Sequence, residues 1–197
     1  MKKNKIIYVE GVPASGKTTI VKKLYEKFDN TIDIIPEYIN LADGSKAEIS
    51  HDPNYFRNND EMKWQIASQS KKSYTFVDRG HLSTVIYNLA EFKIAKKIEN
   101  LEIIDWYFEK ILANNCIPDY YILLQTNPIN SLKRRQRLLG PHNMWEHEKA
   151  LHFANEYYVK LIRSYEPKSK ILILNTDIFN LNQIEEKIIE YFNLHNE

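Results

Sequence analysis

Short apolar runs alternate along the chain with longer segments in which apolar residues recur at helical spacing. The runs are continuous rather than alternating and rich in β-branched residues, which is typical of parallel strands buried on both faces. They predict five strands, namely Lys5–Glu10, Thr31–Ile35, Tyr74–Val77, Tyr120–Gln125 and Ile171–Leu174. Strands that alternate with helices predict an α/β fold with a mostly parallel sheet and helices on both faces.

The segments between the strands contain the predicted helices. In the first of them, Ile20, Leu24 and Phe28 share one helical face. The predicted helices span Thr18–Phe28, Glu61–Ser73, His81–Ala95, Ile98–Asn115, Met144–Tyr165 and Asn182–Phe192, and a shorter one begins at Asn127–Pro128. The polar, turn-rich stretch Asn40–Asn59 is expected to be a loop with one helical turn at most.

The segment Gly11–Thr18, with the sequence Gly-Val-Pro-Ala-Ser-Gly-Lys-Thr, joins the first strand to the first helix. Its spacing matches a phosphate-binding loop, in which main-chain N–H groups and the helix N-terminus bind phosphate oxygens. Lys17 would reach the outer phosphates, and the Thr18 hydroxyl would bind Mg²⁺. The motif predicts a three-layer P-loop NTPase fold with ATP and Mg²⁺ as cofactors. The residues assigned to ATP are Gly11, Pro13, Ala14, Ser15, Gly16, Lys17, Thr18 and Thr19.

Two acidic residues follow predicted strands and are expected at the same edge of the sheet as the phosphate loop. Glu37 follows the second strand, in the crevice where open α/β sheets bind ligands. It could accept a proton from an acceptor hydroxyl, or be a solvated loop acid or N-cap partner. Asp78 and Arg79 follow the third strand, where an acid binds the hydration shell of Mg²⁺ and an arginine neutralises phosphate. The alternative for these two is an Asp–Arg pair that caps the next helix.

Arginine is rare in this chain and gathers in one predicted helix. Only six arginines occur, and Arg134, Arg135 and Arg137 are three of them. Because lysine is the usual cation here, this local use of arginine favours forked phosphate contacts over a solvated charged face. We expect a lid over residues 134–146, in which Arg134 and Arg137 close over the transferring phosphoryl group. Arg135 is assigned to the ATP site together with Asp177, which follows the fifth strand.

Aromatic residues beside polar ones are candidates for the acceptor site. Tyr55, Phe56 and Arg57 could form a lid over a flat ring, or a loop anchored by two rings. Arg57 is the one arginine between the phosphate loop and Arg79, so its position would discriminate between an uncharged acceptor and a phosphorylated one. The residues assigned to the acceptor are Glu37, Tyr38, Tyr55, Arg57, Trp64, Gln65 and Arg79.

Composition and charge narrow the class of protein. The 197 residues are 43% hydrophobic and 27% charged, as in an ordinary globular chain that forms one domain. A formal net charge of +1 argues against nucleic acid and anionic membranes as partners. The single cysteine, Cys116, and the lack of a long apolar segment predict a reducing, cytoplasmic environment. His142, His147 and His152 do not share a helical face, so no zinc site is expected.

Taken in order, these motifs resemble those of the deoxynucleoside kinase and thymidylate kinase group of P-loop kinases. The matching pieces are Glu10–Gly11, Ile34–Glu37, Trp64–Gln65, Asp78–Gly80 and Arg134–Arg137. The resemblance implies that Glu37 activates a sugar hydroxyl and that Gln65 reads the edge of a base. The sequence departs from the nucleoside kinases at Tyr38, where they have a second proline, and at Asp78–Gly80, where they have Glu-Arg-Ser.

Several functions are compatible with these residues. The first is ATP-dependent transfer of the γ-phosphoryl group to a hydroxyl of a nucleoside or related small molecule. A nucleoside monophosphate or an unrelated small alcohol, such as an antibiotic, would be an alternative acceptor, and a homodimer is compatible with each. The other class is a nucleotide-dependent switch or ATPase that acts on a protein partner. Against a GTPase switch, the chain lacks an Asn-Lys-x-Asp motif, and Asp78 is followed by Arg79–Gly80 instead of x-x-Gly.

Overall fold

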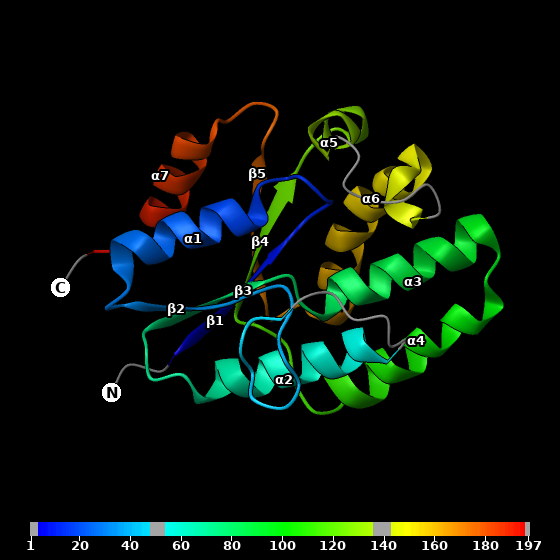
Figure 1. The fold of residues 1–197 in the computed structure, drawn as a ribbon, viewed down its shortest axis with the longest axis horizontal. Coiled ribbons are helices and arrows are strands. Elements are labelled where there is room, and N and C mark those ends of the chain that lie inside the picture. Colours follow the sequence, from blue (N-terminus) through cyan, green and yellow to red (C-terminus); the bar gives the residue numbers. More distant parts are fainter. Residues whose placement is uncertain (1–3, 48–53, 136–142, 196–197) are drawn as a thin grey trace.

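The computed structural model describes residues 4–47, 54–135 and 143–195 of the chain. Its centre is a five-stranded sheet in the order β2-β3-β1-β4-β5, in which every neighbouring pair is parallel (Figure 1). The strands are β1 (Lys5–Glu10), β2 (Ile32–Ile35), β3 (Tyr74–Asp78), β4 (Tyr120–Gln125) and β5 (Lys170–Asn175). The predicted mostly parallel sheet is therefore confirmed, with Asp78 as the last residue of β3.

Helices cover both faces of this sheet. They are α1 (Lys17–Phe28), α2 (Tyr55–Gln69), α3 (His81–Ala95), α4 (Glu102–Trp106), α5 (Pro128–Arg135), α6 (Glu148–Tyr165) and α7 (Leu181–Phe192). One hydrophobic cluster packs α1 and α7 against the sheet, and a second packs α2, α3, α4 and α6 against the other face (Figure 1). Helix α5 follows the carboxyl end of β4, the edge at which parallel α/β sheets place their ligands.

Helix α2 differs most from its prediction. It begins at Tyr55 instead of Glu61 and ends at Gln69 instead of Ser73, so the last five residues of the predicted loop belong to the helix. The residues that α2 buries include Asn59 and Lys63, which are polar. A search for apolar residues at helical spacing does not detect a helix whose buried face is polar.

The predicted helices over Ile98–Asn115 and Met144–Tyr165 are interrupted. The first consists of a 3₁₀ turn (Ile98–Leu101), α4 and a π-helical segment (Tyr107–Leu112). The second begins with a 3₁₀ turn (Met144–Glu146), after which His147 is extended. Such changes of helix type leave the apolar spacing almost unchanged, which is why the sequence pattern showed single helices. Among the helices described, none combines the length and apolar character needed to cross a membrane.

Candidate active site

The loop between β1 and α1 adopts main-chain conformations that favour glycine. Gly11 has a φ of +141°, and a Cβ there would lie 2.3 Å from the carbonyl oxygen of Leu124. Gly16, with a φ of +92°, directly precedes α1, whose first turn has neither a side-chain cap nor an acidic residue. Because the first N–H groups of a helix have no intrahelical partner, such an N-terminus binds anions. This loop has the shape and the electrostatics of a phosphate site.

Lys17 is buried inside this loop. Its Nζ donates hydrogen bonds to the carbonyl oxygens of Gly11 (3.0 Å) and Val12 (2.8 Å) and to the Ser15 hydroxyl (3.2 Å). Burial lowers the pKa of Lys17 to about 7, and Arg79 adds to this effect, against the opposing charges of nearby acids. A phosphate group would supply negative charge that favours the protonated ammonium.

Thr18 and Asp78 meet at the carboxyl ends of the strands. The Thr18 hydroxyl donates to Asp78 Oδ2 at 2.5 Å, which joins the start of α1 to the end of β3. The other oxygen, Asp78 Oδ1, is buried and has no hydrogen-bond partner among the residues described. A hydroxyl beside a buried carboxylate oxygen fits Mg²⁺, which takes oxygen ligands. Thr18 and Asp78 are therefore the residues that could hold the ion.

Glu37 and Arg79 form an ion pair between the ends of β2 and β3. Arg79 Nε lies 2.8 Å from Glu37 Oε1, and both side chains are largely buried. Burial alone would raise the pKa of Glu37, but Arg79, followed by Lys17 and Lys63, outweighs it and holds the pKa below its usual range. Glu37 is consequently ionised at neutral pH and able to accept a proton.

The turn that presents Arg79 is held by a buried acid at the end of β1. Arg79 has a φ of +59°, in the left-handed region that non-glycine residues rarely adopt. Glu10 accepts hydrogen bonds from the Gly80 N–H (2.8 Å) and from the Ser83 hydroxyl (2.5 Å). Arg79 Nη1 in turn donates to the carbonyl oxygen of Gly11 (3.0 Å) and to Ser83 (3.1 Å). These contacts tie the Arg79 turn to the phosphate loop.

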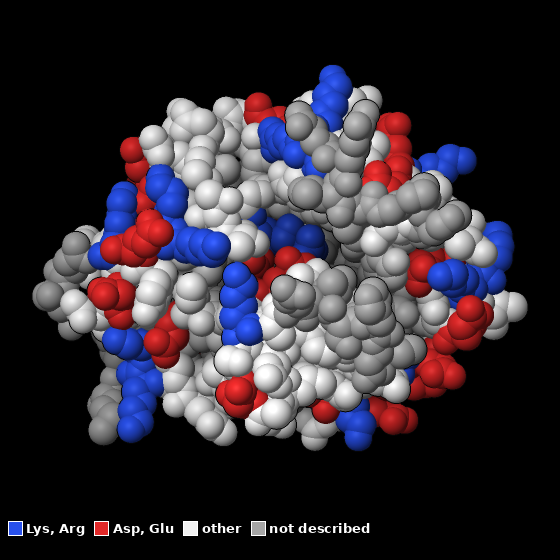
Figure 2. Space-filling model, viewed as in Figure 1, with Lys and Arg blue, Asp and Glu red and all other residues white. Residues whose placement is uncertain are grey.

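Many of these groups line one cavity of about 700 Å³, although the predicted site residues Gly11, Ser15, Asp78 and Asp177 are not among its lining residues. Figure 2 shows this face of the molecule hollowed near its centre, with basic and acidic side chains gathered in the hollow. The predicted site residues that line the cavity are Pro13, Ala14, Gly16, Lys17, Thr18, Thr19, Glu37, Tyr38, Arg57, Arg79 and Arg135. The structure therefore brings the phosphate loop and Glu37 to the same space.

Three predicted acceptor residues on α2 are not brought to the cavity. Tyr55 is buried and donates from its hydroxyl to the carbonyl oxygen of Ile39 (2.7 Å). Trp64 packs against the hydrophobic core, and Gln65 is exposed. Because a helix turns about 100° per residue, Gln65 lies on the side of α2 that faces away from Asp60 and Lys63.

The cavity face of α2 contains polar residues that sequence reasoning missed, namely Asn59, Asp60 and Lys63. Asp60 is 4% exposed and accepts a hydrogen bond from the Thr84 hydroxyl at 2.6 Å. Burial raises the pKa of Asp60, although Lys63 and this hydrogen bond oppose the shift. The signal in the sequence is the spacing of positions 59, 60 and 63, which places three polar side chains on one helical face.

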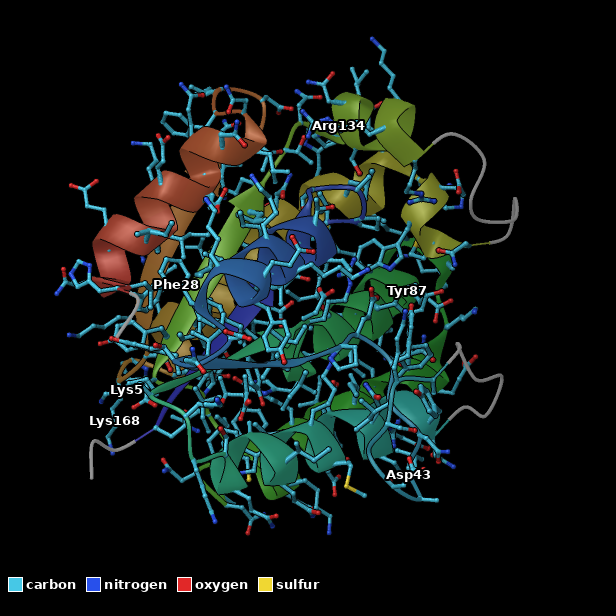
Figure 3. The ribbon with its side chains drawn as sticks, turned by 60° about the vertical axis from the view of Figure 1, so that its left-hand side comes forward. Lys5, Phe28, Asp43, Tyr87, Arg134 and Lys168 are labelled. Carbon is cyan, nitrogen blue, oxygen red and sulfur yellow. The ribbon has the colours of Figure 1, made fainter. Side chains whose placement is uncertain are left out.

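The predicted acceptor cation Arg57 does line the cavity, as do the rings of Phe56, Tyr87 and Trp145. Arg57 Nη2 lies 3.8 Å from Glu102 Oε2, whose side chain is exposed. Tyr87, on α3 (Figure 3), meets the Trp145 ring edge-on, with centroids 5.3 Å apart. The part of the cavity lined by Phe56, Arg57, Tyr87 and Trp145 is its ring-lined lobe.

The two described arginines of the predicted lid point in different directions. Arg134, on α5 (Figure 3), donates to the Thr176 carbonyl and pairs with Asp177 Oδ1, each at 2.9 Å, and does not line the cavity. Arg135 is 4% exposed, lines the cavity and is paired with Glu146. Of these two arginines, only Arg135, which is assigned to the ATP site, lies where a ligand of the cavity could reach it; the predicted position of Arg134 over the phosphate loop is not seen. Arg137, with residues 136–142 of the predicted lid, lies outside the described residues.

No family model matches this chain, and no curated protein matches it. Solved structures do. Deoxyadenosine kinase from M. mycoides with bound dATP has a TM-score of 0.71 and 14% sequence identity, over 96% of this chain and 100% of that one. The same enzyme with bound dCTP gives 0.64 and 16%, again over 96% and 100%. Thymidylate kinase from Candida albicans gives 0.62 and 14%, over 97% of this chain and 92% of that one.

The chain has the fold of these kinases. This confirms the predicted fold class, a three-layer α/β arrangement built around a phosphate loop. At identities of this level the likeness concerns the fold, because unrelated activities can share one fold. The function has to be argued from the site itself.

Proposed function

We propose that this chain is an ATP-dependent kinase that transfers the γ-phosphoryl group to a hydroxyl of a nucleoside. The observation that carries the proposal is that one cavity holds both the phosphate loop with Lys17 and the ionised Glu37. Phosphoryl transfer mainly requires that donor and acceptor be positioned and that charge be neutralised. An ATPase would need the phosphate loop, but it would not need a second, ring-lined lobe beside it.

The donor half of the site consists of the phosphate loop and its neighbours. Lys17 would exchange its contacts with the Gly11 and Val12 carbonyls for phosphate oxygens. Bound at Thr18 and Asp78, Mg²⁺ would neutralise charge on the transferring group. Arg135 lines the same cavity, and this position supports a role for Arg135 in holding phosphate.

The acceptor half is organised around Glu37. Its carboxylate would accept the proton of the attacking hydroxyl, and Arg79 would orient it and stabilise negative charge. The aromatic rings of Tyr38, Phe56 and Tyr87 give the lobe flat apolar surfaces that suit a nucleobase.

A nucleoside monophosphate is the second candidate acceptor. Arg57 lines the cavity, and among the described residues its one ion pair is with an exposed carboxylate at 3.8 Å, so an acceptor phosphate could displace that carboxylate. In that case Arg57→Gln would lower kcat/KM for monophosphates and leave that for nucleosides unchanged. Arg163→Gln, at an exposed position on α6, is the matched control.

Formation of ADP in the presence of nucleosides, nucleoside monophosphates and unrelated alcohols tests the proposal. We expect ADP formation to depend on a nucleoside and to vanish in Lys17→Ala. Equal ADP formation with and without any acceptor would favour an ATPase and overturn the proposal.

A further inference from the structure

Lys63 joins the two acid-bearing strand ends of the site. It is 1% exposed, on the cavity face of α2. Its Nζ donates hydrogen bonds to the main-chain carbonyl oxygens of Glu37 (3.2 Å) and Asp78 (3.0 Å). Since β2 and β3 are neighbours in the sheet, one ammonium group links the candidate base to the candidate Mg²⁺ ligand.

The charge of Lys63 is held mainly by main-chain carbonyls. The nearest carboxylate oxygen, Asp60 Oδ1, is 3.9 Å away, which is beyond hydrogen-bond distance. The Glu37 carboxylate is already paired with Arg79. Burying a charged group is costly, and a buried charge is by itself weak evidence for a stabilising role. Loss of Lys63 would leave two carbonyl oxygens without this donor, so stability and rate have to be measured separately.

Asn59 lies one helical turn before Lys63 and shares part of this contact. Its Nδ2 donates to the Glu37 carbonyl (3.1 Å), and its Oδ1 accepts from the Ile39 N–H (3.1 Å). Asn59 therefore holds only the segment that follows β2, whereas Lys63 holds that segment and also the last residue of β3. Only Lys63, of the side chains described, donates to the main chain of both acidic residues.

We propose that Lys63 is a positioning residue for phosphoryl transfer, because its ammonium fixes the main chain of Glu37 relative to that of Asp78. The inference rests on the proposed function and adds a residue on which the transfer step depends. A displacement of about 1 Å between reacting groups can reduce the rate about 100-fold. Loss of Lys63 should thus act on kcat and leave binding nearly unchanged.

The test compares Lys63→Met with Lys63→Arg, which keeps a cationic group with enough N–H donors for both carbonyl oxygens. We expect Lys63→Met to lower kcat for nucleoside phosphorylation about 100-fold, while the KM of the acceptor and the Kd of ATP change by less than about threefold. The kcat of Lys63→Arg should be at least about tenfold higher than that of Lys63→Met. If Lys63→Met does not fold, Lys63→Gln, which removes the charge and keeps a single donor nitrogen, takes its place with the same expectations.

Lys72 offers a matched control. Its Nζ also donates to two carbonyl oxygens, those of Asp29 (3.0 Å) and Asn30 (3.2 Å), but it is only half-buried and does not line the cavity. Lys72→Met should leave kcat unchanged. A Lys63→Met enzyme with native kcat would overturn this proposal, as would parallel losses of kcat, ATP affinity and thermal stability without recovery in Lys63→Arg. If the native chain phosphorylates no acceptor at all, the proposed function itself fails.

Discussion

Arg79 Nε lies 2.8 Å from Glu37 Oε1, so the guanidinium from the end of β3 holds the carboxylate that follows β2. The pairing has two effects on a proton acceptor. It keeps Glu37 ionised, and it leaves the carboxylate a weaker base than a free one. The acceptor hydroxyl must then approach Glu37 beside Arg79, where charge that develops in the transfer step is also neutralised.

The pH dependence of the reaction should reflect this ion pair. Burial raises the pKa of Glu37. Arg79, Lys17, Lys63 and a hydrogen bond from Tyr38 lower it by more, so the pKa lies below that of an ordinary glutamate. A base must be ionised, so kcat/KM falls only as the pH drops through this lowered pKa. We expect the acidic limb of the pH profile to lie below the range of an ordinary glutamate.

Replacing the arginine tests the cause of that shift. Arg79→Gln removes the largest lowering influence on the pKa of Glu37, so the acidic limb should move to higher pH while kcat falls. Arg163→Gln should leave the limb in place. A limb that is unchanged, or that moves to lower pH, in Arg79→Gln would exclude Glu37 as the titrating base.

ATP binding should take up protons above neutral pH. Burial lowers the pKa of Lys17 to about 7 in the free chain. At pH 8 the amine is therefore mostly neutral, and nearby phosphates raise its pKa again on binding. ATP affinity should decline as the pH rises above about 7.

Calorimetric titration with ATP at pH 8, in two buffers of different ionisation enthalpy, measures this proton uptake. Uptake should be absent in Lys17→Met and unchanged in Lys22→Met, which replaces an exposed lysine on the same helix. Native binding with no proton uptake would show that Lys17 is already charged in the free protein.

Asp78→Asn should separate metal binding from folding. The substitution keeps the size of the side chain and an oxygen that can meet the Thr18 hydroxyl, but it removes the negative charge that would face the proposed Mg²⁺. Because a metal ion contributes several kcal/mol to such transition states, kcat should fall about 100-fold or more. Titration of activity with Mg²⁺ measures the effect, and Asp105→Asn, at an exposed position on α4, is the control. A native Mg²⁺ requirement in Asp78→Asn would contradict the assignment.

Gly80→Ala should destabilise the fold without altering any charged group. A Cβ at Gly80 would lie 2.0 Å from Cδ2 of the buried Tyr8 ring. Overpacking of this kind costs about 1–3 kcal/mol of the free energy of unfolding. Chemical denaturation measures the loss, which should be smaller when Tyr8→Leu removes the ring. Equal losses in both backgrounds would place the cause elsewhere.

Much of this site could be predicted because parallel strands bring their carboxyl ends to one edge. The continuous apolar runs located the strands, so the sequence alone was enough to place Glu10, Glu37 and Asp78 near the phosphate loop. The loop motif itself specifies conformation and chemistry together, since its glycines and Lys17 are required by the same ligand.

The acceptor face of α2 could not be predicted in this way. Asn59 and Lys63 are buried polar residues that donate hydrogen bonds to main-chain carbonyl oxygens. Hydrophobic periodicity detects only the burial of apolar residues. The resemblance to nucleoside kinases pointed to Gln65, which α2 turns outward.

The rotation of α5 about its own axis could not be predicted from the sequence either. Ser131 is buried and donates to the carbonyl oxygen of Pro13 at 2.7 Å, which fixes α5 against the phosphate loop. Arg135 lies four residues later and shares that face, whereas Arg134 turns to Asp177. Adjacent arginines cannot be told apart until such a contact sets the rotation of the helix.

Transfer of labelled γ-phosphate from ATP to nucleosides, followed in the native chain, Glu37→Gln and the exposed control Glu26→Gln, is the decisive measurement. We expect label in a nucleoside monophosphate with the native chain and Glu26→Gln, and transfer about 100-fold slower or worse in Glu37→Gln with unchanged ATP affinity. Label found only in inorganic phosphate, or full transfer by Glu37→Gln, would contradict the assignment of Glu37 as the base of a nucleoside kinase.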